Sequence, residues 1–156
     1  MKGRGEIVEE IYRKNGGEVK EFKKFGGEID VGYRIEYEKR ITEIDVQMFG
    51  LISGDFNPVH FNEDVAAKTK FGGRVVHGML TTGLVSAAVA RMPGLVVLLE
   101  TYFKYTAPVR IGDTVKVVGE VVEKEKNRYR LDVRCYVEGK VVVEGWVKIL
   151  SWPEAG

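Results

Sequence analysis

The side chains best suited to chemistry fall in one stretch of the chain, S-G-D-F-N-P-V-H, from Ser53 to His60. Asp55 and His60 are five positions apart, a spacing that does not place both on one face of a regular helix. Pro58 forces a turn between them, and a turn can bring a carboxylate and an imidazole to the same point in space. Such a pair can hold a water molecule and move its protons, because histidine titrates near neutral pH. The spacing alone leaves another interpretation open, in which Asp55 forms a turn and His60 packs in the core.

A second stretch, from Phe71 to Met79, supplies a different kind of group. Its glycine-rich loop leads into His77 and Gly78, where a helix is predicted to begin. The first backbone N–H groups of a helix have no partner inside it, and the helix dipole is positive at that end. The pattern therefore predicts a site for a carbonyl oxygen that becomes negative during a reaction, as in an oxyanion hole. Taken alone, His77 is more typical of a packed or capping histidine.

Residue patterning predicts the elements that must position these groups. Alternation of apolar and polar residues predicts strands, and apolar residues at helical spacing predict helices. Helices are expected near 5–14, 42–53, 63–70 and 78–91, and strands near 33–38, 95–106, 115–122, 129–137 and 141–150. The helix over 78–91 carries no charge before its last residue. We predict an α+β fold in which a curved antiparallel sheet of about five strands wraps around this long central helix.

The chain divides into a charged, glycine-containing extension, residues 1–27, and a single domain, residues 28–156. The total of 156 residues suits one domain by length. The extension is interpreted as a solvated, partly docked segment, with an arm that binds a partner as the alternative.

Composition excludes several classes of protein. A net charge of +1 argues against a broad basic field for binding nucleic acid. The single cysteine, Cys135, rules out an internal disulfide framework, and its place on the apolar side of a strand predicts a buried, inert thiol. The chain begins without the apolar run of a signal peptide, and its longest uncharged stretch is too short and too polar to span a bilayer. A cytoplasmic protein without membrane contact is expected.

No metal or cofactor site is predicted. A metal would have to use His60 and His77 with Asp55, Glu63 or Asp64, and these positions follow no familiar ligand spacing. The glycines of the second stretch do not follow the G-x-G-x-x-G pattern, and no phosphate-binding loop is present.

Together, SGDFNPVH and VHGML with its following helix resemble the MaoC-like hydratase/dehydratase family, specifically the (R)-specific 2-enoyl-CoA hydratases. The resemblance covers about residues 28–150 and leaves out the extension, which shorter family members lack. It implies a hot-dog fold and a homodimer whose two sheets join edge to edge. It also implies that Asp55 and His60 are the catalytic pair.

The same resemblance implies the residues that bind substrate. Gly78 matches a glycine whose backbone N–H holds the thioester carbonyl, with His77 beside it. Ser86 matches a serine of the family site, and Asn57 matches the motif asparagine that supports the turn.

The expected function is the reversible hydration of a trans-2-enoyl-CoA to the (R)-3-hydroxyacyl-CoA, catalysed by a hydro-lyase that needs no cofactor. Two alternatives share the fold and the ligand class, because fold alone does not decide function. One is an acyl-CoA thioesterase, against which the Asp–Asn–Pro–His turn argues. The other is a non-catalytic acyl-CoA-binding module, against which the intact Asp55–His60 pair argues.

Overall fold

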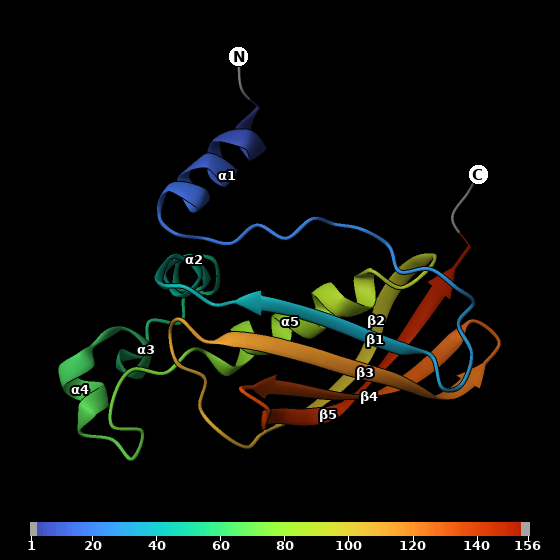
Figure 1. Cartoon of the computed structure of the whole chain (residues 1–156). Coiled ribbons are helices and arrows are strands. Elements are labelled where there is room, and N and C mark those ends of the chain that lie inside the picture. Colours follow the sequence, from blue (N-terminus) through green and yellow to red (C-terminus); the bar gives the residue numbers. More distant parts are fainter. Residues whose placement is uncertain (1–2, 154–156) are drawn as a thin grey trace.

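The computed structural model describes residues 3–153, and Figure 1 shows how the helices and strands are arranged. Residues 1–2 and 154–156, the outer ends of the predicted extension and domain, lie outside the described residues. In chain order the elements are α1 (Arg4–Lys14), β1 (Arg34–Arg40), α2 (Glu43–Ser53), α3 (Pro58–Phe61), α4 (Glu63–Ala67), α5 (Gly78–Ala90), β2 (Leu95–Tyr105), β3 (Thr114–Glu125), β4 (Arg128–Val137) and β5 (Lys140–Trp152). All the predicted helices and strands are present, and α3 is an additional short helix.

One five-stranded antiparallel sheet forms the framework, in the order β1-β3-β4-β5-β2. Short turns join β3, β4 and β5, so these consecutive strands are also neighbours in the sheet. Alternate residues of these strands are buried, and the register places Val117 opposite Cys135 and Val133 opposite Gly145. Because strand side chains alternate between faces, the sheet has one apolar face that another element must cover.

Helix α5 covers that face, and Figure 1 shows it lying along the sheet. Its buried residues, which pack against β1, β2 and β3, are Thr81, Thr82, Leu84, Val85, Ala88 and Val89. A sheet that wraps a central helix in this way is the hot-dog fold, so the predicted architecture is confirmed. Within residues 3–153, no helix is both long enough and apolar enough to cross a membrane.

The ends of α2 determine where the first chemical motif begins. The Thr42 backbone N–H donates to the Asp45 carboxylate at 2.7 Å, as in a capping box at the start of a helix. The helix ends at Gly54, whose φ of 81° is a left-handed conformation that glycine adopts without strain. Asp55 therefore leaves the helix in a new direction.

The N-terminal extension lies against the C-terminal end of α5. The Lys24 ammonium donates to the carbonyls of Ala90, Met92 and Gly94, at 2.7, 2.9 and 2.6 Å. The Arg91 guanidinium donates in turn to a main-chain carbonyl of the extension at 3.0 Å. The Ala90 carbonyl is the last of α5 and has no partner inside the helix, whereas the Met92 and Gly94 carbonyls belong to the turn that follows it. Lys24 therefore ties the extension to the helix end and to that turn. In Figure 1 the blue chain that follows α1 runs over β1 as an extended segment.

We expect Lys24→Met to lower the free energy of unfolding by about 2 kcal/mol, the scale of a hydrogen bond to a charged group. Methionine keeps much of the aliphatic stem and removes the ammonium that serves three carbonyls. Urea unfolding followed by circular dichroism measures the change. The exposed neighbour Lys23 provides the matched control, and Lys23→Met should leave the stability nearly unchanged. Equal effects of both substitutions would contradict a role for the three contacts.

Candidate active site

A chain of local hydrogen bonds forms the turn that carries the aspartate. The Asp55 N–H donates to Ser53 Oγ at 3.1 Å, and Asp55 Oδ1 accepts the Asn57 N–H at 3.1 Å. Asn57 Oδ1 accepts the Val59 N–H at 3.3 Å and caps α3, in which Pro58 is the first residue. Proline suits that position because its missing N–H would have no partner there. The motif thus forms a turn followed by one short helix, α3, which the sequence prediction had missed.

His60 is held by the loop that leads to α5. Its Nδ1 lies 2.7 Å from the Val75 carbonyl oxygen. A carbonyl only accepts, so Nδ1 carries the proton, and Nε2 of the neutral ring has a free lone pair. Arg74 reinforces this arrangement, since its Nε donates to the His60 carbonyl at 2.7 Å.

His77 contacts the Asp55 main chain and the His60 ring, and it is almost fully buried, at 1% exposure. Its Nε2 lies 3.0 Å from the Asp55 carbonyl oxygen, and its ring centroid is 3.9 Å from that of His60. Burial and, to a lesser extent, the charge of His60 lower the pKa of His77, against the opposing effect of the Asp55 main-chain contact.

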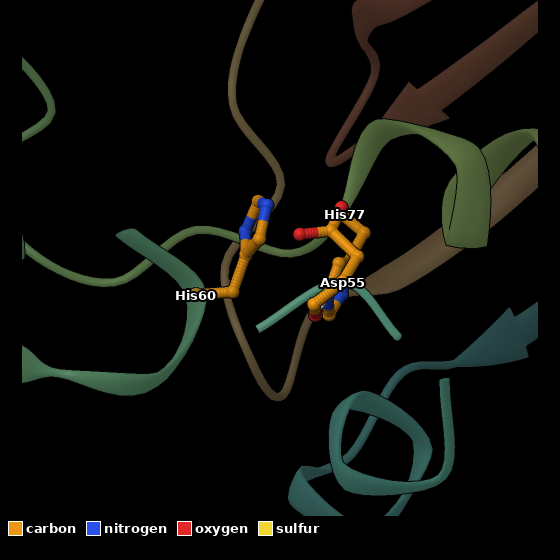
Figure 2. A group of neighbouring side chains, drawn as sticks. All are labelled: Asp55, His60 and His77. Atoms are coloured by element: carbon orange, nitrogen blue, oxygen red, sulfur yellow. Dashed lines mark hydrogen bonds between the residues drawn. The ribbon is translucent and has the colours of Figure 1, made fainter. Parts of the chain in front are cut away.

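The three candidate side chains, Asp55, His60 and His77, form one cluster, in which a ligand atom of each lies within 4.8 Å of the others. Figure 2 shows the Asp55 carboxylate directed toward the His60 imidazole. The turn therefore brings the acid and the imidazole together, as the spacing suggested. Two imidazoles and a carboxylate are also a donor set that could hold a divalent cation, although the ligand spacing in the sequence predicted no such site.

The N-terminus of α5 borders the same cluster. Within residues 3–153, the backbone N–H groups of Gly78 and Met79 have no hydrogen-bond acceptor. These N–H groups stand at the positive end of the helix dipole, which suits an oxygen that gains negative charge. A Cβ on Gly78 would lie 2.6 Å from the Tyr105 ring. A larger residue here would have to displace the Tyr105 ring or the helix start, a constraint that the sequence did not reveal.

A cavity of about 890 Å³ opens beside these groups. Its lining includes Asp55, Asn57, His60, His77, Gly78, Met79 and Tyr105. Ser86 does not line it, and instead lies exposed on α5. Its predicted role in binding substrate stays a prediction.

Sequence reasoning missed the residue that holds the loop between the two motifs. Arg110 donates from Nη1 to the carbonyls of Gly73 and Arg74, at 3.1 and 3.2 Å, and from Nη2 to the carbonyl of Phe71. Nothing in the sequence near Arg110 points to this role, because the contact joins residues more than thirty positions apart.

Cys135 lies in the core, away from the cavity lining, with no exposed surface. Burial raises the pKa of its thiol to about 12. The thiolate is the reactive form of cysteine, so the prediction of a buried, inert thiol is confirmed.

A sheet wrapped around α5, with an aspartate–histidine turn beside the helix N-terminus, places the protein among hot-dog proteins with a polar site at the end of the central helix. The model of the family described as MaoC like domain matches residues 24–144, and the chain belongs to this family.

Similar proteins include two enzymes and one solved structure. The chain is 43% identical to a 3-hydroxybutyryl-CoA dehydratase of Methylorubrum extorquens, over 76% of this chain and 78% of that one. It is 41% identical to an (R)-specific enoyl-CoA hydratase of Rhodospirillum rubrum, over 79% and 88%. A solved protein of Archaeoglobus fulgidus is 68% identical, with a TM-score of 0.93 over 94% of each chain. Because 94% of this chain is covered, the similarity to this structure includes part of the N-terminal extension, residues 1–27.

Proposed function

We propose that the protein catalyses the reversible addition of water to a trans-2-enoyl-CoA, which gives the (R)-3-hydroxyacyl-CoA. The observation that carries this proposal is the placement of the Asp55 carboxylate, the His60 imidazole and the unpaired Gly78 N–H at one cavity. The similarity to a 3-hydroxybutyryl-CoA dehydratase and to an (R)-specific enoyl-CoA hydratase supports the same reaction in its two directions.

Each group has a distinct part in this reaction. Asp55 and His60 hold the water, and the free lone pair on His60 Nε2 accepts a proton from it as the oxygen attacks C3. The double bond is conjugated to the thioester, so the attack places negative charge on the carbonyl oxygen. The Gly78 N–H stabilises this oxyanion, and one such donor contributes about 2.7–4 kcal/mol in other oxyanion holes. The proton taken from water then passes to C2, which restores the pair.

No cofactor is needed, because water and the enoyl thioester together contain every atom of the product. A thioesterase acting in the same cavity would instead direct water to the carbonyl carbon and release free thiol. The two reactions therefore differ in their products, and one assay separates them.

We expect the purified protein to hydrate crotonyl-CoA or a longer enoyl-CoA in the presence of EDTA. Loss of the enoyl-thioester absorbance measures the reaction, and a thiol reagent measures any hydrolysis. Release of free thiol in place of hydration would favour the thioesterase. No reaction across a series of acyl chain lengths would favour the binding module.

The proposed assembly is at least a homodimer. Strand β2 lies at one edge of the sheet, where its backbone groups have no partner on one side. Its exposed apolar residues are Leu95, Val97, Leu99, Tyr102 and Tyr105. The other edge strand, β1, is mostly charged and so resists pairing. A second copy paired along β2 would cover the apolar edge of both chains.

Light scattering at micromolar concentration should accordingly give at least the mass of a dimer. Val97→Lys, which places a charge on the β2 edge, should shift the protein toward the monomer. Glu38→Lys on the β1 edge is the control and should leave the mass unchanged. A wild-type monomer with full activity would contradict the proposed assembly.

A further inference from the structure

We infer that His77 is a positioning residue for the Asp55–His60 pair: held neutral with its proton on Nε2, it fixes the Asp55 main chain and supports the His60 ring. Two contacts of one imidazole carry this inference. Nε2 lies 3.0 Å from the Asp55 carbonyl oxygen, and the ring lies against His60 at a centroid distance of 3.9 Å and an angle of 30°. The kinetic consequences rest on the proposed function, whereas the protonation state does not.

The hydrogen-bond partners of His77 determine where its proton lies. The Asp55 carbonyl can only accept, so Nε2 must donate. Nδ1 is buried and has no hydrogen-bond partner within the described part of the chain. A second proton on Nδ1 would therefore create a buried charge without an acceptor, next to the His60 ring. Burial, the largest effect, and the neighbouring imidazole lower the pKa of His77, and together they outweigh the opposing effects of the Asp55 main-chain contact and of the Asp55 carboxylate.

A neutral His77 suits the chemistry proposed for His60. When His60 accepts the proton of water it becomes a cation, and a second cation 3.9 Å away would oppose that step. A neutral aromatic face against the imidazolium imposes no such repulsion. His77 is itself held by aromatic rings, since Phe49 and Phe61 lie at centroid distances of 4.7 and 5.5 Å. The His77 ring that contacts His60 is thus fixed in place by the two phenylalanine rings.

Three substitutions separate the two contacts. His77→Gln keeps a donor for the Asp55 carbonyl and loses the ring, His77→Phe keeps a ring and loses the donor, and His77→Leu loses both. We expect His77→Gln and His77→Phe to lower kcat about 10-fold each and His77→Leu about 100-fold, because small misplacements of catalytic groups have effects of this size. KM should stay nearly constant, because His77 acts through Asp55 and His60.

Thermal unfolding of each variant is measured beside kcat and KM. A merely structural role would lower the melting temperature without the graded rescue of kcat by Gln and Phe. A raised KM with unchanged kcat would show that His77 binds substrate instead, and would overturn the inference. So would a folded His77→Leu enzyme with normal kcat.

The protonation state can be tested on the unaltered protein, even where a variant fails to fold. The chain contains two histidines, so the imidazole ¹⁵N spectrum of tag-free protein reports only this pair. At pH values somewhat below the ordinary histidine pKa of about 6.5, we expect His77 to remain neutral, with Nε2 protonated and Nδ1 unprotonated. A second proton on His77 near that pH would overturn the inference. This measurement uses no substrate, so its result is independent of whether enoyl-CoA hydration is found.

Discussion

Asp55→Asn and His60→Gln are each expected to lower the turnover of enoyl-CoA at least ~10²-fold, the usual scale for losing a general acid or base. Asp55 is exposed and His60 is half-buried, so both variants should fold. The loss follows from the chemistry, because an amide neither accepts nor returns a proton at neutral pH. Initial rates of enoyl-thioester loss, with circular dichroism to confirm folding, measure the effect.

The double variant provides the sharper test of one shared water. Groups that act as a unit have strongly non-additive effects, so the double variant should be little worse than either single one. Asp64→Asn is the matched control, since it alters an exposed carboxylate on α4 outside the cluster and should retain turnover. Multiplied losses in the double variant, or near-normal turnover of His60→Gln, would contradict the paired-water mechanism.

Gly78→Val is expected to lower turnover by ~10²–10³-fold, the range seen when an oxyanion donor is lost. A Cβ at this position would lie 2.6 Å from the Tyr105 ring, so the branched side chain must displace the ring or shift the helix start. A shift of the helix start moves the Gly78 N–H from its place beside the cavity, and a displaced ring leaves a branched side chain in the path of the thioester. Turnover and thermal unfolding should be measured together.

The Tyr105 contact allows the two causes to be separated. In a Tyr105→Ala background, a methyl group at position 78 no longer meets the ring. The further loss from Gly78→Ala in that background therefore reports obstruction of the thioester itself. Cys135→Ala, a change in the buried core, should keep full turnover with a modest loss of stability. A Gly78→Val enzyme with normal turnover would mean that another group holds the carbonyl.

Much of the fold could be predicted because local patterns and tertiary packing agree. Alternation in β4 placed Leu131 and Cys135 on the buried face, and both are fully buried. The helix predicted near 42–53 is observed as α2, with Thr42 and Gly54 as the caps at its two ends. The uncharged composition of α5 indicated that the sheet surrounds it. In each case, the signal lay within the element itself.

The rest of the site could not be predicted because it depends on contacts between distant segments. Neither the Nε2 contact of His77 with the Asp55 carbonyl nor the packing of Tyr105 on Gly78 has a local pattern. The helix α3 was missed because four residues are too few for a periodic signal. The predicted turn suggested that Asp55 and His60 are close. The contacts of His77 with both residues are visible only in the structure.

The contact of Lys24 with the end of α5 bears on how proteins of this family differ in length. The family match begins at residue 24, within the very segment that satisfies the Ala90, Met92 and Gly94 carbonyls. A protein that began at that boundary would carry Lys24 at a fraying chain end, and the contact that ties the end of α5 and the following turn to the extension would weaken. In a relative that lacks the segment, these carbonyls would take their donors from water or from another part of the chain.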